Sequence, residues 1–139
     1  MSNLHPQLVK DCIQLGTFEL CHLLLMNDSQ YPWFILVPDR DDISEIYQLS
    51  KTEQSQLLHE SSQFSITIAT VFHADKLNIA ALGNVVPQLH VHHIVRYKTD
   101  PAWPAPVWGR YAAIAYTDEE LRQVISRLKV NMPDFSFIV

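Results

Sequence analysis

The stretch Gly83–Arg96, with the sequence GNVVPQLHVHHIVR, decides how the rest of the chain is interpreted. From Gln88 onward apolar and polar residues alternate, which predicts a β-strand. Side chains on a strand repeat every second residue, so Gln88, His90 and His92 are expected to lie in a row on one face. His93 is expected to point to the opposite face and to be structural. The row is therefore the candidate active site.

The row is preceded by the turn residues Gly83 and Asn84. Glycine has no side chain, so bare backbone can approach a ligand closely at such a turn. Neutral imidazole is a good nucleophile near neutral pH and a good leaving group afterwards. Neighbours two residues apart on a strand face are roughly 6.5 Å apart, which suits groups flanking one tetrahedral phosphate.

The chemistry of the row follows from its order. His90, in the middle, is the natural nucleophile at phosphorus. Gln88 and His92 would flank the phosphate as hydrogen-bond donors, and His92 is the better candidate to protonate a leaving group. The competing interpretation is a metal site, in which His90 and His92 bind zinc and a third ligand comes from His22, His73 or a distant carboxylate.

Composition places the chain among ordinary soluble globular proteins. Of its 139 residues 47% are hydrophobic and 18% charged, and the formal net charge is −5. A single domain over residues 1–139 is expected, because this length can bury a sizeable core. The acidic balance argues against nonspecific binding to nucleic acid or to a membrane surface. The chain has only two cysteines and no apolar signal region, so we expect a cytoplasmic protein with reduced thiols. It also has no run of the ~18 apolar residues that a membrane span requires.

Local patterns predict the elements around the row. The expected helices begin at turn or capping signals and lie over residues 5–13, 43–49, 50–72 and 117–131. The expected strands are bounded by glycine, proline or asparagine clusters and lie over residues 17–26, 33–37, 76–82 and from 88 onward. A proline-rich flap over residues 100–109 carries Trp103 and Trp108. This order predicts an α+β domain with an antiparallel sheet.

The row and its surroundings resemble the histidine-triad (HIT) family of nucleotide hydrolases and transferases. The family signature alternates three histidines with apolar residues after a short turn, and residues 83–94 follow that frame. The hairpin residues 23–38 and the strand that contains Asn78 are also similar to the family pattern. The resemblance covers residues 15–97, the expected domain core, and leaves residues 98–139 as a C-terminal flap and helix. Gln88 stands where the first histidine belongs.

The resemblance implies a function and a set of roles. His90 would attack the α-phosphate of a purine nucleotide or nucleotide conjugate and form a covalent nucleotidyl-histidine, which water would then hydrolyse. His92 would contact the same phosphate, Asn27 would lie near the ribose, and Asn78, Gly83 and Asn84 would border the phosphate. The family fold is usually a homodimer and needs no cofactor or catalytic metal.

Gln88 motivates a second hypothesis. Glutamine donates and accepts hydrogen bonds but cannot exchange a proton at neutral pH. The expected substrates of an active enzyme are dinucleoside polyphosphates or phosphoramidates. The alternatives are a catalytically weak nucleotide-binding or sensing module of the same fold, and a metal-dependent hydrolase that uses His90 and His92 as ligands.

Overall fold

Five antiparallel strands form one sheet in the computed structural model, which describes residues 3–139. The spatial order is β1-β2-β3-β5-β4. The strands are β1 (Cys12–Thr17), β2 (Cys21–Met26), β3 (Trp33–Pro38), β4 (Lys76–Ala80) and β5 (Val91–Arg96). The helices are α1 (Pro6–Asp11), the short 3₁₀ helix η1 (Ile46–Gln48), α2 (Lys51–Val71) and α3 (Asp118–Asn131). The α+β fold predicted from the sequence is confirmed.

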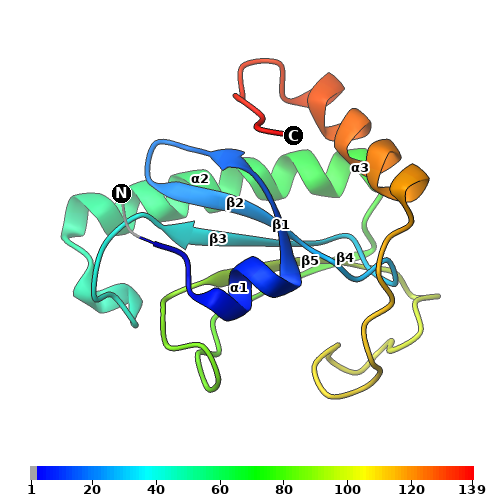
Figure 1. The fold of residues 1–139 in the computed structure, drawn as a ribbon, viewed down its shortest axis with the longest axis horizontal. Coiled ribbons are helices and arrows are strands. Elements are labelled where there is room, and N and C mark those ends of the chain that lie inside the picture. The colour runs from blue at the N-terminus through cyan, green and yellow to red at the C-terminus, as the bar shows by residue number, and fades with distance from the viewer. Residues whose placement is uncertain (1–2) are drawn as a thin grey trace.

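Each face of the sheet buries its own apolar cluster. On one face, Phe64 and Ile68 of α2 pack against Phe34 of β3, and Leu128 of α3 joins the same cluster. On the other face, Leu8 of α1 packs against the apolar side chains of β2 and β3. Figure 1 shows α2 running behind the sheet and the short α1 in front of it. The α1 face carries the histidines discussed below.

Two capping boxes place the long helices where the sequence predicts them. The Ser50 hydroxyl accepts from the Glu53 N–H at 3.1 Å, and the Glu53 carboxylate accepts from the Ser50 N–H at 2.9 Å. Thr117 and Glu120 repeat this exchange at the start of α3. Each pair satisfies backbone donors that the first helical turn leaves free. Among the described residues, no helix is long and apolar enough to cross a membrane.

The N-terminal prediction is wrong in one respect, because the expected helix over residues 5–13 ends at Asp11 and a strand begins at Cys12. This strand, β1, pairs with β2 around a bulge between Gln14 and Gly16. Local apolar spacing favoured a helix, whereas pairing with a distant strand favours the extended form. The bulge also interrupts the alternation that would have identified a strand. The expected strand over residues 17–26 is correspondingly shorter.

The histidine strand also begins later than expected, at Val91. Leu89 donates its N–H to the Ile43 carbonyl of a loop at 2.9 Å, and residues 88–90 lie outside the sheet. The helix expected over residues 43–49 is only the single turn of η1. The loop that contains Ile43 is thereby held beside the start of β5. The Ile43 carbonyl bonds to Leu89, so it does not take part in a helix.

Candidate active site

A cleft of about 430 Å³ opens on the α1 face of the sheet, beside the histidines. Apolar side chains make up most of its wall, and polar groups from α1, the turn before β5 and β5 itself converge on it. Its lining includes Leu8, Asp11, Trp33, Asn84, His90, His92 and Trp108. The structure therefore brings His90 and His92 together at one side of a cavity.

His90 is held in one tautomer by the backbone. Its Nδ1 lies 2.7 Å from the Gln88 carbonyl oxygen. A carbonyl only accepts hydrogen bonds, so Nδ1 carries the proton and neutral His90 has a free electron pair on Nε2. The side chain is 7% exposed and lines the cleft. This is the protonation pattern that a nucleophilic imidazole requires.

His92 is held in the opposite tautomer by an indole. Trp33 donates its Nε1–H to Nδ1 of His92 at 2.9 Å. An indole only donates, so Nδ1 accepts and neutral His92 carries its proton on Nε2. The centres of the His90 and His92 rings are 5.0 Å apart. A ring nitrogen with a free electron pair and a ring N–H are thus carried by neighbouring side chains.

Burial keeps His92 neutral. Desolvation, and to a lesser extent the neighbouring His90 and His93 rings, lower the pKa of His92 from 6.5 to about 3. The group therefore has no additional proton near pH 7. His92 is thus a neutral hydrogen-bond donor through Nε2–H, and its expected role in protonating a leaving group stays a prediction.

His93 lies on the opposite face of the sheet, as the alternation predicts. Its Nδ1 bonds to the Val91 carbonyl at 3.0 Å and its Nε2 to the Ser61 hydroxyl at 2.7 Å. Burial lowers the pKa of His93 to about 4. The ring packs against Phe64 of α2 in the core. Its position is structural.

Gly83 and Asn84 line the same cleft as the two histidines. Gly83 has a φ of 74°, a left-handed conformation that glycine adopts without the strain other residues meet. The turn therefore depends on glycine at this position. The turn lies in the same cleft as His90 and His92, and its contact with a ligand stays a prediction.

Asn27 and Asn78 are not among the residues that line the cleft. The Asn27 side-chain oxygen accepts from the Tyr116 N–H at 3.0 Å, which ties β2 to the segment before α3. The Asn78 side-chain oxygen accepts from the buried Arg96 guanidinium at 2.7 Å. In this structure both amides hold the fold together, and neither is placed with the histidines.

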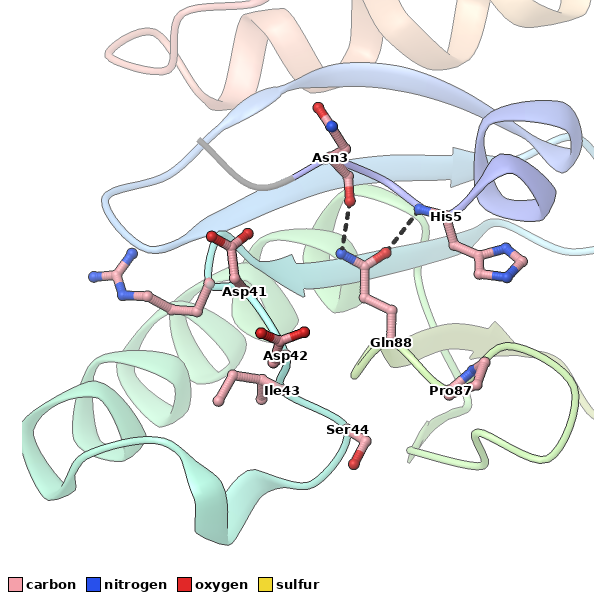
Figure 2. Close-up of a pocket in the computed structure, with 9 residues that line it drawn as sticks. Asn3, His5, Asp41, Asp42, Ile43, Ser44, Pro87 and Gln88 are labelled. Atoms are coloured by element: carbon pink, nitrogen blue, oxygen red, sulfur yellow. Dashed lines mark hydrogen bonds between the residues drawn. The ribbon is translucent and has the colours of Figure 1, made fainter.

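Gln88 is bound to the N-terminal segment, as Figure 2 shows. Its side-chain oxygen accepts from the His5 N–H at 2.8 Å, and its side-chain nitrogen donates to the Asn3 carbonyl at 3.1 Å. Gln88 lines a neighbouring hollow formed with the loop Asp41–Ser44, not the histidine cleft. Its amide and its backbone carbonyl are thus both engaged, the second with His90.

Sequence reasoning missed two contributors to the cleft. The first is α1, whose Leu8 and Asp11 form one wall. The second is Trp33, which looks like an ordinary apolar strand residue in the sequence. Trp108, one of the two flap tryptophans, also lines the cleft, and its ring centre is 5.1 Å from that of His92. Of these three contributors, only Trp108 was marked in the sequence, by its place in the proline-rich flap.

The metal hypothesis requires a third ligand beside His90 and His92. Within residues 3–139, no group of three histidine, cysteine or acidic side chains is arranged to hold a metal ion. His22, on β2, instead lies 3.5 Å from the carboxylate of Asp39, which follows β3. His73 is exposed in the turn after α2. The geometry does not supply the ligand set that the hypothesis needs.

Comparison with known proteins extends the sequence resemblance. A search among curated proteins found no match. Three solved structures align over nearly the whole chain. A histidine triad protein from Marinobacter aquaeolei VT8 has 48% sequence identity and a TM-score of 0.92, covering 96% of this chain and 98% of that one.

Two further structures agree with this match. A histidine triad protein from Bradyrhizobium japonicum is 45% identical with a TM-score of 0.91, and a histidine triad (HIT) protein from Sinorhizobium meliloti 1021 is 43% identical with a TM-score of 0.90. Each alignment covers 93% of this chain and 96% of the other. The family model for the HIT domain matches residues 7–99. With its antiparallel sheet and paired cleft histidines, the chain belongs to the HIT domain family.

Proposed function

We propose that the protein hydrolyses a nucleoside 5′-phosphate derivative, a dinucleoside polyphosphate or a phosphoramidate, through a covalent nucleotidyl-histidine at His90. The observation that carries this proposal is the pair of opposite tautomers in one cleft. His90 presents an electron pair, whereas His92 presents an N–H. Membership of a family of nucleotide hydrolases and transferases supports the same chemistry.

The reaction proceeds in two displacements at one phosphorus atom. In the first, Nε2 of His90 forms a bond to the α-phosphorus while the bond from phosphorus to the leaving group breaks. A polyphosphate leaves as its anion, and an amine leaves with a proton taken from solvent. In the second, water attacks the same phosphorus and releases a proton to solvent, the bond to His90 breaks, and a nucleoside monophosphate leaves. His92 donates from Nε2 to a phosphoryl oxygen in both steps, which stabilises the charge that develops there.

The cleft supplies a place for the nucleoside. Leu8 and Trp108 give it apolar surface for a purine, and Asp11 is a carboxylate acceptor within reach of the same cavity. Gly83 and Asn84 border the site beside the histidines. We assign the nucleoside to this cleft and the α-phosphate to its histidine side.

A nucleotide-binding or sensing module is the second candidate, and the geometry of Gln88 favours it. The position that resembles the first triad histidine carries an amide bound to Asn3 and His5. That amide contacts a phosphate only after it gives up these two backbone partners. In this alternative the protein binds the nucleotide in the same cleft and turns it over slowly.

Trapping the intermediate distinguishes the two candidates. Protein is mixed with a diadenosine polyphosphate, or with an adenosine phosphoramidate, carrying a radioactive α-phosphorus, and is then denatured within the first turnovers. The proposal predicts label bound to the protein through an acid-labile, alkali-stable bond, at unchanged yield in excess chelator. Turnover without bound label would exclude the covalent route, and nucleotide binding without turnover would indicate the sensing module. Turnover lost in chelator would restore the metal hypothesis.

We also propose that the protein is a homodimer, joined through α2 and the sheet edge. β4 is the outermost strand on that side, and its Ile79 is 50% exposed. Leu58 of α2 is 67% exposed, and both side chains line one apolar hollow. A second copy would cover this surface and pair with the exposed strand edge.

Sedimentation equilibrium checks the dimer. Wild type is expected at twice the mass of the chain, and the variant Ile79→Lys at the monomer mass, because a buried lysine without a partner opposes association. Val130→Lys, on an exposed position of α3, is the matched control and is expected to stay dimeric. A monomeric wild type at micromolar concentration would refute the proposal.

The two thiols support a proposal for the setting of the reaction. Cys12 and Cys21 are both free in the structure. Free thiols suit a reducing compartment, and nucleotides are abundant there, so we place the activity in the cytoplasm.

A further inference from the structure

Trp33 is the residue behind His92. It begins β3, pairs in register with Ile94 of β5, and is 7% exposed. Ile35 is the partner of His92 in that register, so Trp33 is its diagonal neighbour across the two strands. Large aromatic side chains reach such diagonal neighbours. The indole therefore extends along the sheet face to the imidazole.

The contact between them is a directed hydrogen bond. The donor is the indole Nε1–H, the acceptor is Nδ1 of His92, and the distance is 2.9 Å in a buried site. Indole has no acceptor, and buried tryptophan usually satisfies its N–H. Trp108 packs edge-on against both rings, with ring centres 5.9 Å from Trp33 and 5.1 Å from His92. The two indole rings together fix the plane of the His92 imidazole.

The bond from Trp33 also decides whether Nε2 of His92 carries a proton. With Nδ1 occupied as an acceptor, the single proton of neutral His92 resides on Nε2. The opposite tautomer would place two N–H groups against each other at the indole and leave Nε2 with an electron pair. It could then no longer donate to a phosphoryl oxygen.

We propose that Trp33 is a positioning residue that holds His92 as the Nε2–H tautomer and thereby keeps a hydrogen-bond donor beside the nucleophile His90. The inference rests on the proposed function for its effect on rate. The tautomer itself is a property of the free protein. Besides the two histidines, the titratable group that lines the cleft is Asp11.

The first arm of the test measures the tautomer without substrate. Protein labelled with ¹⁵N-histidine is examined by long-range ¹H–¹⁵N NMR, with a His92→Gln spectrum to assign the signals. Wild type is expected to show His92 protonated on Nε2, and Trp33→Phe a mixture of tautomers with a raised His92 pKa. Trp108→Phe is the matched control and is expected to keep the wild-type tautomer. A wild-type His92 protonated on Nδ1 would overturn the proposal.

The second arm measures coupling in catalysis. Trp33→Phe is expected to lower kcat about tenfold with little change in KM, as found for groups that orient a functional side chain from behind. In a His92→Gln background the same change is expected to have no further effect, because an amide donates without a tautomer to fix. Equal losses in both backgrounds would overturn the proposal and make Trp33 a packing residue.

Failure of the proposed function is distinguishable from failure of this inference. If wild type turns over no nucleotide, the tautomer arm still decides whether Trp33 controls His92. The kinetic arm is then replaced by the affinity for AMP. Calorimetry measures it in wild type, Trp33→Phe, His92→Gln and the double variant. The expected pattern is the same, with weaker binding in Trp33→Phe only when His92 is present.

Discussion

Replacing His90 by alanine is expected to lower kcat for a dinucleoside polyphosphate by more than about 10³-fold, as loss of a nucleophile does in other enzymes. Without the Nε2 electron pair the first displacement has no acceptor for the nucleotidyl group. The radioactive protein adduct should disappear together with turnover. Steady-state kinetics and the trapping experiment measure the two effects on the same preparation.

The fold is expected to survive this change. His90 lies outside β5, and its Nδ1 bond to the Gln88 carbonyl is the hydrogen bond that the structure shows for its ring. Circular dichroism and thermal unfolding of His90→Ala should therefore match the wild type closely. His59→Ala, an exposed histidine on α2, is the matched control and should leave kcat unchanged. Turnover within tenfold of wild type in His90→Ala would remove His90 from the role of nucleophile.

The parts of the site that local sequence could predict are those set by strand alternation. Alternation separated His90 and His92 from His93, and the glycine signal located the turn at Gly83 and Asn84. Sequence could not predict that Gln88 binds the backbone of Asn3 and His5, which are 85 and 83 residues away in the chain. Such contacts depend on the path of the whole chain.

Partners far away in the sequence also explain why the contacts of Asn27 and Asn78 could not be predicted. Asn27 is bonded to Tyr116, 89 residues along the chain, and Asn78 to Arg96 on the neighbouring strand. No local pattern announces a partner at that distance. The family resemblance located their strands, whereas the orientation of each amide depends on residues far away in the sequence.

The elements of the fold also differ in whether local sequence or long-range pairing determines them. The capping boxes at Ser50 and Thr117 are local, and both helices begin where they indicate. β1 is not local, because Cys12–Thr17 becomes a strand by pairing with β2 and by its bridge from Gly16 to Phe137. Its bulge breaks the alternation that would have revealed it. Long-range pairing decided this element against its local propensity.

The flap beside the cleft depends on one buried ion pair. Arg96, 1% exposed, donates two hydrogen bonds to the Asp100 carboxylate at 2.8 and 3.1 Å. It also donates to the Ala105 carbonyl at 2.8 Å and packs over the Trp103 ring. Burial acts to raise the pKa of the Asp100 carboxyl. The hydrogen bonds from Arg96 and from backbone N–H groups outweigh burial and hold this pKa below its usual value. Arg96 thus joins the end of β5 to the segment that carries Trp108.

Arg96→Ala is expected to lower the free energy of unfolding by about 3–5 kcal/mol, because it leaves a buried carboxylate without its partner. Denaturant unfolding measures this loss, and Arg96→Lys, which keeps the charge but not the paired geometry, should lose less. Arg40→Ala is the matched control, since its pair with Glu53 is exposed and contributes little to stability. In Arg96→Ala the flap should also loosen, so the tryptophan fluorescence of the protein should shift and nucleotide binding should weaken. Equal stability losses in Arg96→Ala and Arg40→Ala would show that the buried pair does not hold the flap in place.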